Sequence, residues 1–113
     1  MVYLQCVAGG NDITLTFTAG GAGKAAYELR SGGAVIASSP DDGGRWTVTI
    51  PAPPVGGQNF DLVALTASPG GNPTPISVAG RQNGAALQDT SGQNGLLGSV
   101  TNAGDGVQFY MGA

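Results

Sequence analysis

The stretch that decides the fold is Gly43-Gly44-Arg45-Trp46-Thr47-Val48-Thr49-Ile50-Pro51. Its two glycines favour a turn, and its proline cannot donate a hydrogen bond to a neighbouring strand. Between them, large apolar residues alternate with polar ones. Successive side chains of a strand point to opposite faces, so the alternation places Trp46, Val48 and Ile50 on one face. The stretch therefore predicts a half-buried β-strand that ends before Pro51.

The same two-residue alternation recurs along most of the chain. Ile13, Leu15 and Phe17, for example, alternate with three threonines. Residues 59–67 carry apolar side chains on both faces, which favours a central strand. Further strands are expected at residues 2–7, 27–30, 34–37, 76–78 and 107–111, with weaker apolar runs at 87 and 96–97.

Glycine, proline and asparagine separate these runs. The 113 residues include 21 glycines and 7 prolines, and the pairs Asn83-Gly84 and Asn94-Gly95 favour tight turns with positive φ. Glycine also interrupts every segment that has apolar residues at helical spacing. We therefore expect an all-β fold, an antiparallel β-sandwich of about eight short strands that forms a single domain over residues 1–113.

Charged residues make up only 10% of the chain, with 4 basic and 7 acidic residues and a net charge of −3. The basic residues are dispersed, so the sequence lacks the positive patch that binds a phosphate backbone, and we expect no nucleic-acid partner. The surface must be covered by hydroxyls, amides and bare glycine backbone. Such a surface repels its neighbours weakly, which favours a homo-oligomer and an extracellular or particle-surface location.

Cys6 is the only cysteine, so no intrachain disulfide is predicted. We expect it to be a small buried hydrophobe in the first strand. Five residues precede it, too few for the signal segment of a lipoprotein, and no signal peptide is expected in this chain. No apolar run approaches the roughly 20 residues of a membrane-spanning helix, so we expect no membrane insertion.

The sequence contains no histidine. Histidine is the commonest general base near neutral pH and a common zinc ligand, so its absence disfavours hydrolase triads and imidazole zinc sites. We expect the protein not to be an enzyme and to have no resident cofactor. Two alternatives stay open: a hydrolase based on two carboxylates, and calcium held by Asp41 and Asp42 or by Asn102 and Asp105.

Polar side chains concentrate between residues 80 and 105. Amides and carboxylates present the fixed donors and acceptors that hydroxyl-rich ligands need, although a solvated loop without a ligand would have the same composition. The candidate ligand-binding residues are Arg81, Gln82, Asn83, Gln88, Asp89, Asn94, Asn102 and Asp105, with Gln93 beside them.

Four aromatic residues form two pairs that differ in their position in the sequence. Tyr27 and Trp46 lie at alternating positions within strands, so we expect them in the core. Tyr3 and Tyr110 lie near the two ends of the chain. An exposed ring there would stack on a sugar or pack against a neighbouring subunit.

Two segments carry a family resemblance. Residues 41–52 combine an acidic glycine turn, a tryptophan strand and an Ile-Pro-Ala ending, and residues 56–67 combine a glycine turn with an aromatic, alternating strand. In these features, residues 12–78 resemble the bacterial immunoglobulin-like modules that occur in tandem in surface adhesins and other exported proteins. The resemblance implies an immunoglobulin-like β-sandwich that serves as a spacer or binding scaffold. Residues 68–72 lack the acid of the corresponding loop, so no calcium junction is implied, and the residues after 78 have no counterpart.

The expected function is that of a non-enzymatic structural and adhesion module on an extracellular or particle surface. Its expected partner is a glycan or a protein surface. The alternative is a small carbohydrate-binding lectin that uses the loops between residues 80 and 105.

Overall fold

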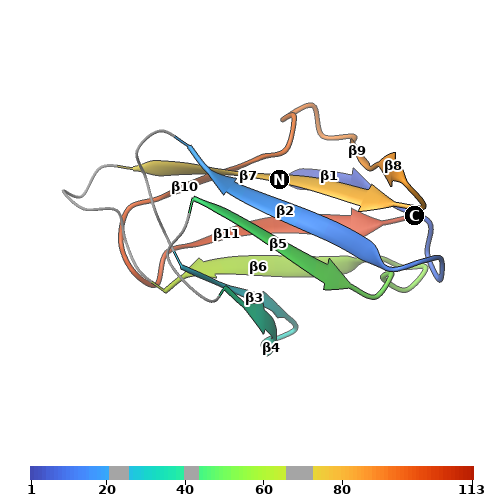
Figure 1. Cartoon of the computed structure of the whole chain (residues 1–113), viewed down its shortest axis with the longest axis horizontal. Helices are drawn as coiled ribbons and strands as arrows, with labels where there is room; N and C mark the ends of the chain where they lie inside the picture. The colour runs from blue at the N-terminus through green and yellow to red at the C-terminus, as the bar shows by residue number, and fades with distance from the viewer. Residues whose placement is uncertain (21–25, 40–43, 66–72) are drawn as a thin grey trace.

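A computed structural model describes residues 1–20, 26–39, 44–65 and 73–113 of the chain (Figure 1). Within these ranges the chain forms eleven strands, two of which contain only two residues. In chain order they are β1 (Val2–Gln5), β2 (Ile13–Ala19), β3 (Tyr27–Ser31), β4 (Ala34–Ser38), β5 (Arg45–Ile50), β6 (Gln58–Ala64), β7 (Thr74–Gln82), β8 (Ala85–Ala86), β9 (Gln88–Asp89), β10 (Leu96–Val100) and β11 (Gly106–Gly112).

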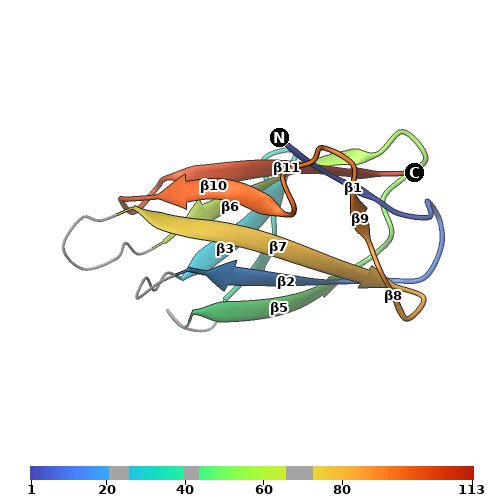
Figure 2. The same ribbon diagram turned by 90° about the horizontal axis from the view of Figure 1, so that it is seen from above.

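The strands form two sheets that pack face to face. Sheet A has six strands in the order β4-β3-β6-β11-β1-β9, and sheet B has the order β10-β7-β2-β5 with β8 paired to β7. Figure 2 shows the sheets as two layers. The predicted all-β sandwich is confirmed, and most pairs are antiparallel. The pair β1–β11 is the exception among the described strands, because these two run parallel.

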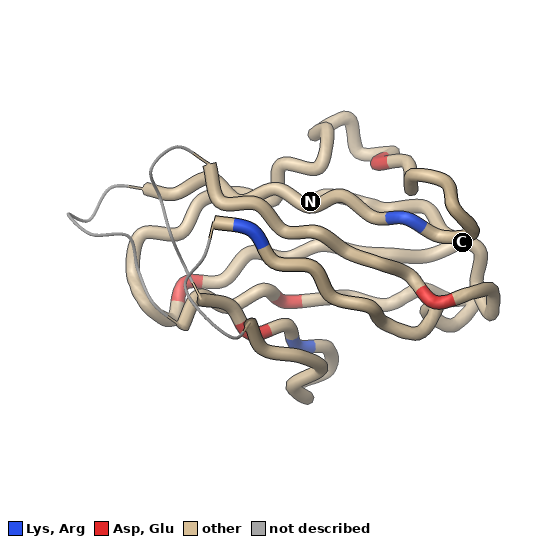
Figure 3. The backbone as a smooth tube through the Cα atoms, viewed as in Figure 1, with Lys and Arg blue, Asp and Glu red and all other residues tan. Residues whose placement is uncertain are grey.

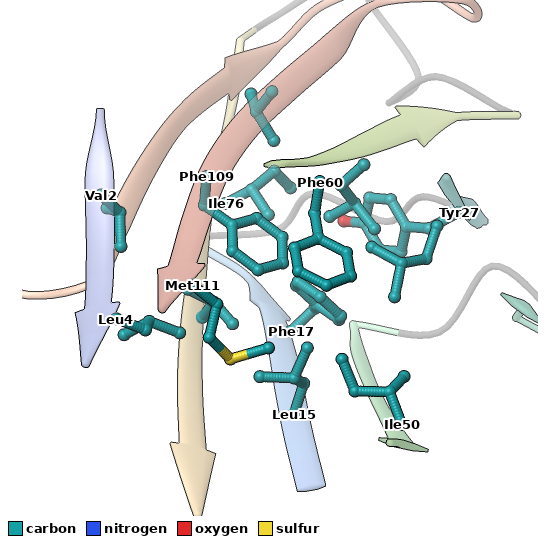
Figure 4. Close-up of a cluster of buried hydrophobic side chains, with 14 of the residues drawn as sticks. Val2, Leu4, Leu15, Phe17, Tyr27, Ile50, Phe60, Ile76, Phe109 and Met111 are labelled. Atoms are coloured by element: carbon teal, nitrogen blue, oxygen red, sulfur yellow. The ribbon is translucent and has the colours of Figure 1, made fainter. Parts of the chain in front are cut away.

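The core lies between the two layers and is rich in aromatic side chains (Figure 4). Phe109 is fully buried, and its ring lies 5.1 Å from that of Phe60 and 5.9 Å from that of Phe17. Tyr27 is also buried and stacks on Trp46, which packs against the core from the edge of sheet B. The core position predicted for Tyr27 is confirmed, whereas Trp46 is only partly buried.

The strand that contains Trp46 forms as its sequence predicts. β5 ends at Ile50, directly before Pro51. Exposed residues alternate along it with residues that are at least partly buried, and these include Trp46, Val48 and Ile50. β6 is central, between β3 and β11, as the apolar residues on both of its faces predict. It ends at Ala64, however, and Leu65 beyond it is 43% exposed. The rest of the predicted strand, residues 66 and 67, lies outside the described ranges.

The first strand is shorter than predicted, and Gln82 is the reason. β1 ends at Gln5 instead of extending to residue 7. Beyond it, the backbone of Val7 pairs with a side chain instead of a strand: its N–H donates to Gln82 Oε1 at 2.8 Å, and its carbonyl accepts from Gln82 Nε2 at 2.9 Å. Cys6 is buried, as predicted, but it lies just after the strand.

β7 is nine residues long, whereas the sequence predicts only residues 76–78. Pro75 and Gly80 suggest breaks in the strand when they are considered alone. In the structure, β7 lies between β10 and β2 and forms ladders with both. A Cβ at Gly80 would lie 2.7 Å from Cδ1 of Leu87, so a side chain at this position would displace Leu87. Pairing with two neighbouring strands therefore extends β7 beyond what its own sequence predicts.

The buried hydroxyl of Tyr27 has no hydrogen-bond partner within the part of the chain that the structure describes. An unsatisfied buried hydroxyl costs about 1–3 kcal/mol. Replacement by phenylalanine keeps the ring and removes that cost. We therefore expect Tyr27→Phe to keep or raise the free energy of unfolding, measured by urea denaturation near neutral pH. A loss above about 1 kcal/mol would mean that the hydroxyl is hydrogen-bonded.

The same variant has a predicted pH signature. Burial raises the pKa of Tyr27 from 10.0 to about 12. Between these values the unfolded state loses the proton and the folded state keeps it, so stability is complete below pH 10 and falls as pH rises toward 12. We expect the stability of Tyr27→Phe to fall less than that of the wild type over this window. Equal losses in both proteins would contradict the prediction.

Candidate functional site

The outer face of sheet A carries a row of three side chains across three neighbouring strands. Tyr3 of β1 is paired with Tyr110 of β11, and Tyr110 is paired with Asn59 of β6. The two rings lie 4.7 Å apart between centroids, with an angle of 35° between their planes. Both tyrosines are half-buried and Asn59 is exposed. We call these three residues the tyrosine row.

Tyr110 is held in place by the turn before β6. Its hydroxyl donates a hydrogen bond to the carbonyl oxygen of Gly56. Gly57 has a φ of +77°, and a Cβ at this position would overlap the Tyr110 hydroxyl. A residue with a side chain is therefore disfavoured at Gly57 by backbone conformation and by space. The turn fixes the ring on the sheet, so its position is set before any ligand arrives.

A shallow hollow of about 250 Å³ lies at the tyrosine row and is lined by Met1, Val2, Tyr3, Asn59 and Tyr110. No lysine or arginine side chain lines it. Further along the same face, Gln108 is paired with Asp61, and Asp61 with Arg30. Arg30 forms an ion pair with Glu28, and Figure 3 shows charged residues thinly scattered over the described backbone. The surroundings of the hollow are therefore polar but largely neutral.

A second region gathers most of the polar residues predicted between 80 and 105. Two hollows, of about 380 and 410 Å³, share Ala86, Leu87 and Gln88 in their linings. One also contains Gln82 and Asn83, and the other also contains Asp89 and Asn94. We call this region the Leu87 hollows. Arg81 lies next to it on β7, where its guanidinium donates to the carbonyl oxygen of Gly84 at 2.6 Å.

Gln82 was predicted as a ligand-binding residue, and its side chain serves the fold instead. It is only 5% exposed, and its amide is bonded to the backbone of Val7. Its Nε2 also donates to the carbonyl oxygen of Asn11 at 2.9 Å. These bonds use the acceptor and both donor hydrogens, so little of the amide's capacity is left for a ligand.

Asp89 likewise holds backbone groups together. Its Oδ1 accepts from the N–H of Tyr3 at 3.2 Å and from the N–H and hydroxyl of Ser91, and its Oδ2 accepts from the N–H of Gly95 at 2.9 Å. Desolvation by partial burial raises the pKa of the carboxyl, but these hydrogen bonds together outweigh it and lower the pKa from 3.8 to about 2. Asp89 therefore joins β1 to the 91–95 turn as a carboxylate that is ionised near neutral pH.

We expect Asp89→Asn to lower the free energy of unfolding by about 1–3 kcal/mol near neutral pH, because one amide position can no longer accept a hydrogen bond. The folded-state pKa lies below the unfolded one, so the wild-type advantage is present above pH 4 and is lost as pH falls toward 2. Urea denaturation across this range is the measurement. Asp12→Asn, at an exposed loop residue, controls for the lost charge. Equal losses in the two variants would contradict the assignment.

Asn102 and Asp105 lie at the opposite end of the sandwich from the other predicted residues. They follow β10, whose last residue, Val100, pairs with the first residue of β7. Gln82 lies eight residues further along β7, about 26 Å away at the usual rise of a strand. Asp105 Oδ2 accepts from the N–H groups of Asn102 and Thr101, which lowers the pKa of the carboxyl. The eight predicted residues therefore do not form one site.

The described residues contain no group of three or more acidic or cysteine side chains that would hold a metal ion. The alternative calcium ligands Asp41 and Asp42 lie outside the described ranges. The Asp105 oxygen Oδ2 already accepts two backbone hydrogen bonds, from Thr101 and Asn102.

Asn59 and Gln108 were not predicted as site residues. Their alternation with Phe60 and Phe109 indicates that they face outward. The alternation does not reveal which strands pair. The pairing of β6 with β11 places Asn59 beside Tyr110. The sequence does single out the two tyrosines, but only the parallel pairing of β1 with β11 joins them.

Protein-family models, curated protein sequences and solved structures give no significant match to this chain. Among the described residues, no helix is long and apolar enough to cross a membrane.

Proposed function

We propose that this protein is a non-enzymatic structural and adhesion module of an extracellular or particle surface, and that it binds its partner through the outer face of sheet A. The observation that carries the proposal is the tyrosine row. It places two adjacent, half-exposed aromatic rings and an exposed amide on a sheet face that no described strand covers (Figure 2). Exposed aromatic groups with polar neighbours are typical of binding surfaces.

We also propose that the sandwich is immunoglobulin-like. The order β4-β3-β6-β11 fits strands C′, C, F and G of a variable-type domain, and the pair β2–β5 fits strands B and E. Under this assignment, β7 to β10 are inserted between F and G, where the family resemblance in the sequence ends. The insertion would add β7 to the free side of strand B.

The electrostatics of the described acids support binding over catalysis. Asp89 and Asp105 accept backbone hydrogen bonds that lower the pKa of each carboxyl. Such groups stay ionised near neutral pH, so they are poor general acids. The sequence has no histidine to take that role.

A second candidate is a small lectin that uses the Leu87 hollows. The observation that favours it is the exposed amide side chains of Asn83, Gln88 and Asn94 in their linings. Amides offer both donors and acceptors to sugar hydroxyls. Both oxygens of Asp89 already accept hydrogen bonds from backbone N–H groups. Asp89 would therefore add only its shape and negative charge to the lining of the hollow.

A glycan-array screen, with calcium and with chelator, together with the solution mass of the chain tests both candidates. Binding without change to the glycan, or self-association, supports an adhesion or assembly role. Binding that is lost in Gln88→Ala and Asn94→Ala supports the lectin at the Leu87 hollows. A chain that binds no glycan would contradict the lectin candidate, and release of product from an arrayed glycan would contradict the non-enzymatic assignment.

A further inference from the structure

We infer that the tyrosine row is a binding site for one unit of an uncharged glycan, whose ring stacks on Tyr3 and Tyr110 and whose hydroxyls bond Asn59. This inference rests on the proposed function and names the ligand class and the residues. It differs from the lectin candidate because the site lies on the sheet face and not at the Leu87 hollows.

The aromatic part of the site suits the apolar face of a sugar. A pyranose presents C–H groups on one face, and the electron-rich face of a phenol ring attracts the positive edge of such groups. The rings of Tyr3 and Tyr110 are adjacent, with centroids 4.7 Å apart and an angle of 35° between their planes. Both residues line the hollow, so a sugar ring that enters it would meet aromatic surface from two strands.

The site is also organised in advance. The Tyr110 ring is tied to Gly56 through its hydroxyl, and the backbone of Tyr3 is held by the bond from its N–H to Asp89. Both residues lie on strands inside sheet A, not on loops. Little conformational entropy remains to be lost when a ligand binds, which raises affinity for a small ligand.

Polar groups surround the hollow at suitable spacing. Asn59 lies at its edge and offers two donors and an acceptor to vicinal hydroxyls. Gln108 and Gln5 are two residues along their strands from Tyr110 and Tyr3, about 7 Å away on the same face. They would meet the neighbouring units of a longer glycan.

Charge and size restrict the ligand further. No lysine or arginine side chain lines the hollow, so a carboxylated or sulfated sugar would find no cationic side chain there to offset its lost hydration. Asp61, on the same face of β6, disfavours anions as well. The hollow of about 250 Å³ is smaller than the roughly 300–1,000 Å³ of pockets for drug-sized ligands, which fits a single sugar unit.

The test uses the full chain and soluble oligosaccharides of glucose, galactose, mannose and N-acetylglucosamine, with sialylated and sulfated oligosaccharides as the charged arm. Backbone amide spectra are recorded by NMR during titration, and affinity is measured by calorimetry. The variants at the tyrosine row are Tyr3→Ala, Tyr3→Phe and Asn59→Ala, and Gln88→Ala probes the Leu87 hollows. Thr16→Ala, on the outer face of sheet B, is the matched control.

We expect at least one neutral oligosaccharide to shift the amides of β1, β6 and β11. Tyr3→Ala and Asn59→Ala should weaken its binding at least about tenfold, while Tyr3→Phe and Thr16→Ala stay within about threefold. Folding of each variant is checked from the same spectra. If Tyr3→Ala fails to fold, the affinities of Tyr3→Phe and Asn59→Ala are compared instead.

Three results would overturn the inference. Binding that survives Tyr3→Ala and Asn59→Ala but is lost in Gln88→Ala would move the site to the Leu87 hollows and leave the proposed binding role intact. Binding of charged glycans alone would refute the ligand class. A dimer that dissociates in Asn59→Ala would show that a second copy of the chain covers the row.

Discussion

Phe109→Ala is expected to lower the free energy of unfolding by about 3–5 kcal/mol, the usual cost of removing a buried phenylalanine. Phe109 is fully buried in β11 and stacks on Phe60, with ring planes 11° apart. It also meets Phe17 of sheet B, so it joins the two layers. Small domains have only about 5–15 kcal/mol of stability in total, so the variant should lose a large part of it.

Urea denaturation followed by Trp46 fluorescence measures this loss, because the single tryptophan packs on Phe17 at 5.6 Å. Val55→Ala is the control, since Val55 is 82% exposed and its truncation should cost less than about 0.5 kcal/mol. A loss below about 1.5 kcal/mol in Phe109→Ala would contradict the central place given to this ring.

Gly95→Ala is expected to have the second large effect. Gly95 has a φ of +77°, and a Cβ there would collide with the carbonyl oxygen of Val78, a backbone atom of β7. The Val78 N–H donates to the Gly95 carbonyl at 2.9 Å, so the turn cannot move away without breaking that bond. Strain and a lost hydrogen bond together should cost about 3 kcal/mol or more.

Gly84→Ala is the matched control for this variant. Gly84 has nearly the same φ, +76°, but a Cβ there would meet nothing within 4 Å. It should therefore show only the cost of the left-handed conformation, about 1–2 kcal/mol. Urea denaturation of both variants separates conformation from crowding. Equal losses of stability in the two variants would mean that the clash with Val78 does not contribute to the effect of Gly95→Ala.

Local patterns predicted much of the fold. The alternation around Trp46 and the stop at Pro51 correspond to β5, and both Asn-Gly pairs adopt the positive φ expected of tight turns. These features depend on neighbouring residues only, through steric limits on φ and the two-residue period of a strand. The sequence could therefore report them without knowledge of the partner strands.

The candidate site was predicted less completely, because its members are far apart in the chain. Gln82 and Asp89 have the composition of ligand-binding residues, but each bonds backbone groups more than seventy positions away at Val7 and Tyr3. Asn59 gave no signal of its own. A polar side chain in a sequence does not reveal whether the protein or a ligand will satisfy it.

By itself, the sequence determined that the chain alternates apolar and hydroxylated residues in short strands, that it carries little charge, and that histidine chemistry is excluded. Only the tertiary structure decided that β7 continues through Pro75 and Gly80, and that β1 lies parallel to β11 so that Tyr3 meets Tyr110. The physical reason is the distance along the chain over which each interaction acts. Side-chain alternation is set by covalent geometry between adjacent residues, whereas strand pairing is set by the burial of a core assembled from the whole chain.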